Sequence, residues 1–218
     1  MDRFGLIGYP ISHSLSPGLF KEAFGGRYAY DIIETPDFEE AWTRFVEGPY
    51  RAVNVTTPFK TQAAERADIP SREVKAIGAA NILVKTPEGI KAYNSDYLAV
   101  RSILENCVEG AALPRGCTRV VVIGGGGAGR AALAAATDSG FMASLKHHDE
   151  IASGVRADII IYTLPKAVEG CDLLDAPVLV EANYRDPVLA SHRGYIPGTA
   201  WLKAQAVLGY PLMVEQSR

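Results

Sequence analysis

The feature that most constrains the fold is a glycine-rich stretch between an apolar run and an alanine-rich run. Residues 120–123 are a short β-branched run, typical of a buried strand, and residues 131–136 favour a helix. Between them, Gly124, Gly126 and Gly129 have the GxGxxG spacing of a dinucleotide-binding turn. Glycine lets a pyrophosphate reach the backbone N–H groups at a helix N-terminus, where a Cβ would hold it away.

The predicted cofactor-binding residues are those of the turn: Gly124, Gly125, Gly126, Gly127, Ala128, Gly129 and Arg130. A second interpretation stays open at this point. In it, the glycines only allow a strand and a helix to pack closely, and no ligand is involved.

Length and composition limit the classes of protein that need to be considered. The chain has 218 residues, 48% of them hydrophobic and 22% charged, which suffices for one large or two small folded domains. The net charge of -3 and the absence of a Lys/Arg run argue against a nucleic-acid partner. We see neither a signal peptide at the N-terminus nor an apolar run long enough for a membrane span.

Cysteine and histidine usage predicts a cytoplasmic protein without a metal site. The three cysteines are far apart and lack CxxC spacing, which suits free thiols in a reducing compartment. The four histidines lack metal-ligand spacing, and we expect His147 and His148 on opposite faces of a strand.

Periodicity predicts an α/β fold with a parallel sheet, because strands alternate with helices or short connectors. Strands are expected at residues 3–8, 28–34, 52–55, 82–85, 90–93, 120–123, 142–148, 157–163 and 178–182. Helices are expected at residues 18–24, 38–46, 61–67, 72–77, 97–108, 131–139 and 199–208, the last of them followed by Pro211. Residues 110–116, rich in Gly, Ala and Pro, are expected to link two domains.

A hydroxyl-rich loop follows the first predicted strand. Residues 11–17 contain three serines and a histidine, and Ser14 and Ser16 could bind a carboxylate or sugar-like hydroxyl groups. Their alternative role is to cap the helix that Pro17 begins, but capping needs only one of them.

A second polar group follows the third predicted strand. Asn54, Thr56 and Lys60 cluster where Pro58 ends this strand and a helix begins, which is where open α/β sheets hold ligands. Asp96 follows the predicted hairpin of residues 82–93. Its alternative role is the N-cap of the next helix, and that of Lys60 is a solvated lysine at a helix start.

Five stretches in order resemble the shikimate dehydrogenase family, and the similarity covers nearly the whole chain. They are GYPISHSLSP at residues 8–17, NVTTPFK at 54–60, GAAN at 78–81, NSD at 94–96 and GGGGAGR at 124–130. A weaker similarity lies at residues 201–206.

The resemblance implies an N-terminal α/β substrate domain, a Rossmann-like domain that holds NADP, and reversible reduction of 3-dehydroshikimate to shikimate in aromatic amino-acid biosynthesis. The corresponding limits are residues 1–108 for the substrate domain, 109–195 for the cofactor domain, and 196–218 for a C-terminal helix that returns toward the substrate domain. The implied substrate-binding residues are Ser14, Ser16, Thr56, Asn81, Asp96, Gln205 and Tyr184, and the implied catalytic pair is Lys60 and Asp96.

Hydride transfer at a carbinol carbon requires such a pair independently of the family resemblance. When hydride leaves a carbinol carbon, the hydroxyl proton must leave too, so a general acid/base must touch that oxygen. A lysine can serve if burial lowers its pKa, or as a cation that stabilises the developing alkoxide, and a nearby carboxylate orients it. The sequence leaves these two modes open.

The chain departs from the family pattern between residues 140 and 157, where it is short. The Asn-Arg-Thr-like segment that contacts the 2′-phosphate of NADP is replaced by Lys146, His147, His148 and Asp149. We therefore expect a truncated cofactor domain. Asp149 lies 149 − 129 = 20 residues after Gly129, where an acid that binds the NAD ribose is expected, so NADP is predicted and NAD is not excluded.

Two alternative functions remain. One is a quinate/shikimate dehydrogenase, and the other is a non-catalytic shikimate-binding paralogue with impaired cofactor binding. Apart from the small-molecule substrate we expect no nucleic-acid or membrane partner, and either a monomer or a homodimer.

Overall fold

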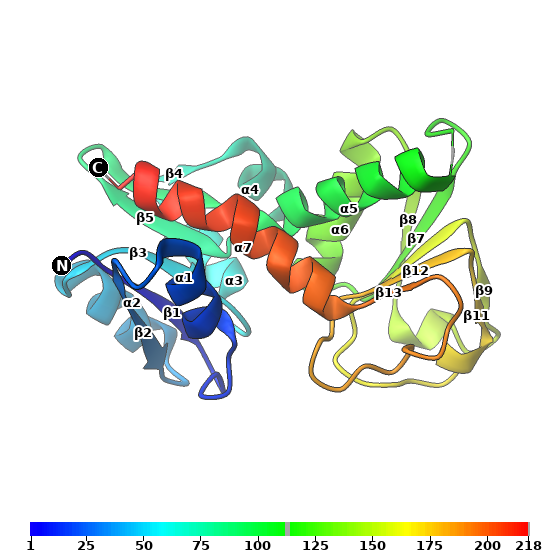
Figure 1. Cartoon of the computed structure of the whole chain (residues 1–218), viewed down its shortest axis with the longest axis horizontal. Helices are drawn as coiled ribbons and strands as arrows, with labels where there is room; N and C mark the ends of the chain where they lie inside the picture. The colour runs from blue at the N-terminus through cyan, green and yellow to red at the C-terminus, as the bar shows by residue number, and fades with distance from the viewer. Residues whose placement is uncertain (112–113, 218) are drawn as a thin grey trace. The chain divides into compact units, whose positions relative to one another are not determined.

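The computed structural model describes residues 1–111 and 114–217, which form two compact units. The first unit contains Met1–Ser95 and the chain from Gln205 onward, and the second contains Asp96–Ala204. Each unit has a sheet of its own (Figure 1). Buried apolar residues pack within each unit. The functional domain limits at residues 108 and 195 stay a prediction.

The first unit is built on a six-stranded sheet in the order β2-β1-β3-β5-β6-β4. Strands β1 (Arg3–Gly8), β2 (Ala29–Glu34) and β3 (Tyr50–Val55) are parallel, and β5 (Ile82–Thr86) with β6 (Gly89–Tyr93) forms the predicted antiparallel hairpin. The two-residue strand β4 (Ile69–Pro70), which the sequence did not predict, pairs with β6.

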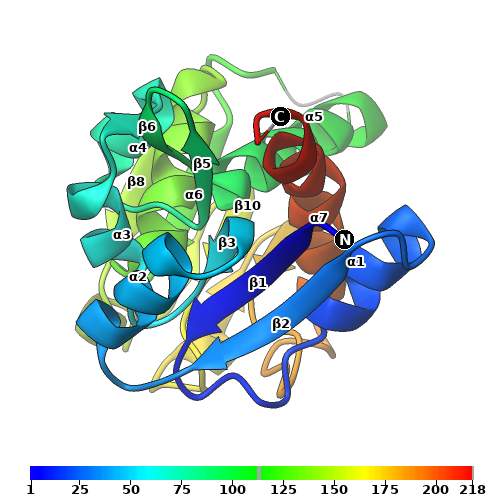
Figure 2. The ribbon, with the colours of Figure 1, turned by 90° about the vertical axis from the view of Figure 1, so that its left-hand side faces the viewer.

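Both faces of this sheet are buried, because successive strand residues point to opposite sides. Ala52 contributes to one core and Val53 to the other. One face carries α2 (Phe38–Glu47), α3 (Lys60–Arg66) and α4 (Arg72–Ile77), and the other carries α1 (Ser16–Phe24) and the end of α7 (Gly198–Glu215) (Figure 2).

The second unit is built on a five-stranded parallel sheet in the order β13-β12-β10-β7-β8. Its strands are β7 (Arg119–Ile123), β8 (Met142–Lys146), β10 (Ile159–Tyr162), β12 (Val178–Glu181) and β13 (Tyr195–Ile196). Helix α6 (Gly127–Asp138) connects β7 to β8, and α5 (Ser95–Ala111) precedes the sheet.

The later crossovers of this sheet are short, as predicted for a truncated cofactor domain. After β8 the chain forms the 3-10 turn η1 (His148–Glu150) and strand β9 (Val155–Arg156). After β10 it forms η2 (Cys171–Leu173) and β11 (Leu174–Asp175), and β9 and β11 pair as a small parallel sheet. Within the described ranges, α6 is the one α-helix that joins two strands of the five-stranded sheet.

Several local predictions are wrong. Helix α5 begins at Ser95, so Asp96 lies within its first turn and is not the N-cap. Strand β8 ends at Lys146, so His147 and His148 do not belong to a strand. Helix α6 begins at Gly127, four residues before the prediction. Helix α5 also covers residues 110 and 111 of the predicted linker, of which residues 112–113 lie outside the described part.

Another error concerns Pro211, which lies inside α7 and does not follow it. A proline within a helix removes one hydrogen bond and costs roughly 3 kcal/mol. The residues around it are buried against the first sheet: Tyr210 is 5% exposed and Met213 is 0% exposed. This packing outweighs the local penalty. No helix in the described ranges is long and apolar enough to cross a membrane.

Candidate functional site

The loops after β1 and β3 are joined at the carboxyl ends of these neighbouring strands. The backbone N–H of Tyr9 donates to the carbonyl of Thr57 (3.0 Å), and that of Thr56 donates to Ile7 (2.9 Å). The two loops pass so closely that a Cβ on Gly8 would lie 2.5 Å from Cγ2 of Thr56. Glycine is therefore required at this position, and the serine loop is held beside the segment that leads to Lys60.

The serine loop itself is ordered by hydrogen bonds. Ser14 donates its backbone N–H to Ile11 (2.9 Å), and the hydroxyls of Ser14 and Ser16 are 3.2 Å apart. Ser14 Oγ also accepts the N–H of Ser16 in the first turn of α1, whose N-cap residue, Leu15, makes no capping bond. Capping thus involves Ser14 alone, and Ser16 has no such role.

Asn81 and Ser95 form a buried pair. The amide of Asn81 donates to Ser95 Oγ (3.0 Å) and accepts the backbone N–H of Ser95 (2.7 Å). The neighbouring N–H of Ala80 donates to the carbonyl of Lys60 (2.8 Å). The backbone of Lys60 therefore lies close to Asn81 in the first unit. Asp96 is the residue after Ser95 in the chain.

Asp96 is 4% exposed and has a partner that the sequence did not suggest. Its Oδ1 accepts a hydrogen bond from Nε1 of Trp201 (3.0 Å), at the start of α7 and 105 residues away. Trp201 is 3% exposed. A buried carboxylate held by an indole N–H has a fixed orientation, which a group that must point at a reacting centre needs.

The remaining predicted substrate residues are spread over the two units. Thr56 and Gln205 are half-buried in the first unit. Gln205 lies one helical turn before Gly209, where a Cβ would come within 2.9 Å of Ser95 Cβ. Tyr184 is on the loop after β12 of the second unit, where burial raises its pKa.

The glycines of the predicted cofactor turn have different structural roles: some allow close packing, and one leaves the N-terminus of α6 open. Gly124 has φ +110, and a Cβ there would lie 2.5 Å from Oγ1 of Thr163, in the loop after β10. A Cβ on Gly129 would collide with the Gly124 carbonyl oxygen, so Gly129 allows the close packing of α6 against the end of β7. Gly126 is different: it is the N-cap of α6, and nothing lies within 4 Å of its Cβ position. The N-terminus of a 12-residue helix is thus open at Gly126, which fits the pyrophosphate of a dinucleotide.

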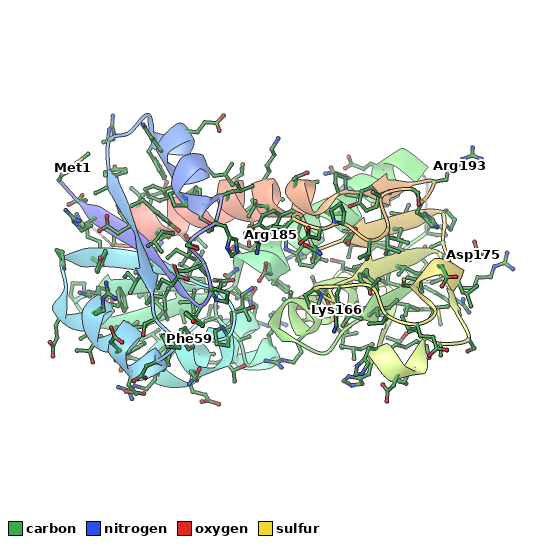
Figure 3. All side chains as sticks on the ribbon, turned by 90° about the horizontal axis from the view of Figure 1, so that it is seen from below. Met1, Phe59, Lys166, Asp175, Arg185 and Arg193 are labelled. Carbon is green, nitrogen blue, oxygen red and sulfur yellow. The ribbon has the colours of Figure 1, made fainter. Side chains whose placement is uncertain are left out.

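Two loops at the same ends of the strands complete this edge of the second sheet. The turn after β10 carries Lys166 (Figure 3). The Lys166 carbonyl accepts a hydrogen bond from the Tyr162 hydroxyl (2.7 Å). Asn183, after β12, donates to the Pro165 carbonyl (3.1 Å) and ties this turn to the loop of Tyr184.

The turn after β8 replaces the phosphate-binding segment that the family resemblance led us to seek. Its ends are fixed by a reciprocal capping box: the N–H of His147 donates to Glu150 Oε2 (2.6 Å), and the His147 ring accepts the N–H of Glu150. The ring also packs on Gly125, where a Cβ would lie 2.7 Å from its Cε1. Lys146 and Arg130 supply positive charge here, and Asp149 and Glu150 supply negative charge.

No three His, Cys, Asp or Glu side chains of the described ranges are grouped so that they could hold a metal ion. In the first unit Ser14, Ser16, Thr56 and Lys60 follow the parallel strands β1 and β3, and in the second unit Tyr184 follows the parallel strand β12. The carboxyl ends of parallel strands are the usual place of ligands in open α/β sheets. Together with the glycine turn, this arrangement defines a two-domain α/β protein of the dinucleotide-binding class.

Comparison with known proteins identifies the family. The sequence profile of the shikimate dehydrogenase substrate binding domain matches residues 6–83. Shikimate dehydrogenase (NADP(+)) of Anaeromyxobacter sp. strain K is 31% identical in an alignment that covers 95% of this chain and 77% of that protein. The chain therefore belongs to the shikimate dehydrogenase family, as its motifs predicted.

Other relatives match over a smaller part. Shikimate dehydrogenase (NADP(+)) of Chromohalobacter salexigens is 36% identical over 61% of this chain, and the match spans 49%, about half, of that protein. The fold agrees with the crystal structure of shikimate 5-dehydrogenase from Thermus thermophilus, with a TM-score of 0.79 at 22% identity over 99% of this chain and 94% of that one.

Proposed function

We propose that the protein is an NADP-dependent shikimate dehydrogenase that reversibly reduces 3-dehydroshikimate to shikimate. The observation that supports the proposal is that one chain contains both the residues proposed for the substrate and those proposed for the cofactor. Ser14, Ser16 and Asn81 stand in the unit that matches the substrate binding domain, and Gly126 opens a helix N-terminus in the other. The curated name of the Anaeromyxobacter relative supports the same substrate and cofactor.

In this proposal the substrate is bound by hydroxyl and amide groups. Ser14 and Ser16 donate to its carboxylate. Its ring hydroxyls are held by Thr56, Asn81, Asp96 and Gln205, and Tyr184 is a further proposed substrate-binding residue. Hydroxyl and amide side chains can each donate and accept, which suits a polyhydroxy acid.

Lys60 and Asp96 are the proposed catalytic residues. The reduced nicotinamide, when bound, supplies the hydride to the carbonyl carbon. The Lys60 ammonium then gives its proton to the carbonyl oxygen, so that a C–H and an O–H bond form as the C=O π bond is lost. Asp96, held by Trp201, orients the lysine and accepts from the substrate hydroxyl. The reverse reaction returns the proton to Lys60.

NADP is the proposed cofactor, on the strength of the relatives and of two cations. Lys146 ends β8, and Arg130 lies in the first turn of α6 with Nη1 3.4 Å from the Gly125 carbonyl oxygen. Asp149 lies in the turn η1, which follows β8. Its carboxylate favours the ribose hydroxyls of NAD over a 2′-phosphate, so the preference for NADP is expected to be modest.

The test is to mix the folded protein with shikimate and either NADP or NAD and to follow reduced nicotinamide by its absorbance. Turnover with NADP is expected, and silence with both cofactors would overturn the activity. Comparing kcat/KM for shikimate and quinate separates shikimate dehydrogenase from a quinate/shikimate enzyme.

The short crossovers of the second unit favour one further candidate, a non-catalytic shikimate-binding paralogue. Calorimetric titration separates it from the enzyme. Binding of shikimate without binding of NADP or NAD would support the paralogue, and binding of both ligands supports the dehydrogenase.

A further inference from the structure

A carboxylate at the end of β2, outside every motif considered above, contacts the serine loop. Glu34 is the last residue of β2, and its Oε1 accepts the backbone N–H of Ile11 (3.0 Å). In the parallel pair of β1 and β2, Glu34 lies opposite Gly8, the last residue of β1. Its side chain therefore reaches from the end of one strand to the loop that leaves the neighbouring strand, within the first unit.

Ile11 is a closely packed residue of this loop. It is 4% exposed, and a Cβ on Gly8 would lie 2.9 Å from its Cγ2. A backbone N–H bonds more strongly to a carboxylate than to a neutral acceptor, and a buried N–H that loses its acceptor is costly. Removing the Glu34 carboxylate therefore favours a shift of the loop at Ile11.

Ile11 in turn holds the two serines. Its carbonyl accepts the N–H of Ser14 (2.9 Å), and Ser14 Oγ accepts the N–H of Ser16 (3.2 Å). Consecutive hydrogen bonds thus run from Glu34 through Ile11 and Ser14 to Ser16. Every donor in this path is a backbone N–H, so the path uses no hydroxyl proton of either serine and does not compete with a bound anion for those protons.

We propose that Glu34 is a positioning residue of the carboxylate-binding site, which it holds from β2 through Ile11. The inference rests on the proposed function only in taking Ser14 and Ser16 as the carboxylate donors. A loop that is already fixed has less freedom to lose when the anion binds. The negative charge of Glu34 itself acts against an anionic ligand, so the useful property of this side chain is its acceptor oxygen.

The experiment is calorimetric titration of shikimate into the wild type, Glu34→Ala, Glu34→Gln and a matched control, Asp31→Ala. Asp31 is a second carboxylate of β2, but it pairs with Arg3 of β1 (2.7 Å). Loss of the acceptor predicts that the Kd of Glu34→Ala rises about 3- to 10-fold. Glu34→Gln keeps an oxygen acceptor without the charge, so its Kd should stay within about 2-fold of the wild type, as should that of Asp31→Ala.

Two further measurements separate positioning from a general structural effect. In turnover, Glu34→Ala should raise the KM of shikimate by the same factor and change kcat and the Kd of NADP little. In a double-mutant cycle with Ser14→Ala, the combined loss of shikimate affinity should be smaller than the sum of the single losses, because Glu34 acts through Ser14. Simple additivity, or equal losses in Glu34→Ala and Glu34→Gln, would contradict the inference.

Glu34→Met gives an independent test if Glu34→Ala folds poorly. Its unbranched side chain occupies similar space but offers the Ile11 N–H no oxygen acceptor, so it should raise the Kd of shikimate in the same direction. The outcomes also separate the two proposals. Wild-type protein that fails to bind shikimate overturns the proposed function, whereas tight wild-type binding that neither Glu34→Ala nor Glu34→Met weakens overturns only the role of Glu34.

Discussion

At the scale of single residues, Lys60 is the first test of the proposed chemistry. It begins α3, and its carbonyl is tied to Ala80, next to Asn81. Because general acid/base catalysis contributes about 10²–10⁴-fold, Lys60→Ala should lower kcat by that factor and leave the Kd of shikimate within a few-fold. Steady-state kinetics and calorimetry measure the two quantities. Lys75→Ala, at an exposed site on α4, is the control. An unchanged kcat in Lys60→Ala would remove Lys60 from the reaction.

Trp201 gives a second prediction at this scale, through its bond to Asp96. Trp201→Phe keeps an aromatic ring and removes the N–H donor, which leaves a buried carboxylate oxygen without this partner. We expect a loss of about 1–3 kcal/mol in the free energy of unfolding and a fall of about 10-fold in kcat/KM. Urea denaturation and initial rates measure these effects. Trp42→Phe, in the core of the first unit, is expected to lower stability without a comparable loss of kcat/KM.

The sequence located many candidate residues because they stand in short, distinctive motifs. The serine loop and the glycine turn are local in the chain, and each was found from its residue types and spacing. The partners of these residues were not found. Trp201 and Asp96 are 105 residues apart, and Tyr30 and Asn54 are 24 apart, so only the fold brings each pair together.

At the scale of elements, replacing two glycines at the start of α6 by alanine should have opposite effects: one replacement should lower stability, and the other should weaken NADP binding. A methyl group at Gly129 would meet the Gly124 carbonyl, so Gly129→Ala should destabilise the second unit by about 3 kcal/mol. A methyl group at Gly126 meets no atom within 4 Å, so Gly126→Ala should cost at most about 1 kcal/mol. It would, however, stand where the pyrophosphate must approach, and the Kd of NADP should rise more than about 10-fold.

Thermal unfolding and cofactor titration separate these effects. Wild-type NADP affinity in Gly126→Ala would mean that the open N-terminus of α6 is not the cofactor site. Wild-type stability in Gly129→Ala would contradict the tight contact between α6 and β7.

The buried end of β12 predicts a pH dependence. Glu181 is 0% exposed and accepts hydrogen bonds from the Val188 N–H (2.9 Å) and the Tyr195 hydroxyl (2.9 Å). Burial, together with Glu181, raises the pKa of Tyr195 from 10.0 to about 12. A raised tyrosine pKa means that the folded state favours the neutral phenol. This stabilisation is complete below pH 10 and is lost as the pH rises from 10 to about 12.

Tyr195→Phe isolates this contribution from other alkaline titrations. After allowance for its partial exposure, the tyrosine contributes roughly 1 kcal/mol. The variant should unfold at a lower temperature than the wild type at pH 8 and lose less stability above pH 10. Parallel curves of Tm against pH for the two proteins would contradict the prediction.

The main strands and helices could be read from local patterns, but the shortest strands could not. β4, β9, β11 and β13 have two residues each, and only their partners in the fold define them. The prediction that Pro211 follows the last helix is wrong for a related reason. The local cost of a proline is visible in the sequence, whereas the burial of Tyr210 and Met213 that offsets this cost is not.

At the scale of the whole molecule, the two units differ in which segments of the chain complete their apolar cores. The first unit is completed by the end of α7, where Met213 and Val214 join Phe4 and Phe20 in one core. In the second unit, Ile151, Val155 and Leu174 from the short connectors bury one face of the sheet. Each unit therefore has an apolar core built from its own residues, and the shortened crossovers have not left the second sheet without cover.

Separate cores imply that a ligand should protect the unit that binds it. A ligand at 100 times its Kd adds about 2.7 kcal/mol to the stability of the state that binds it. Shikimate is therefore expected to slow hydrogen exchange in the first unit, around residues 14–16 and 54–60. NADP is expected to slow it in the second unit, around residues 124–130 and 147–150.

Hydrogen exchange read by mass spectrometry, with each ligand alone and with both, measures this pattern. Gly126→Ala is the control, because it should lose the protection by NADP and keep the protection by shikimate. If either ligand alone slowed exchange equally through both sheets, the units would open as one, and the two binding sites could not be assigned to separately stable parts of the chain. Protection by shikimate restricted to residues 124–150 would place the substrate in the wrong unit and contradict the assignment of Ser14 and Ser16.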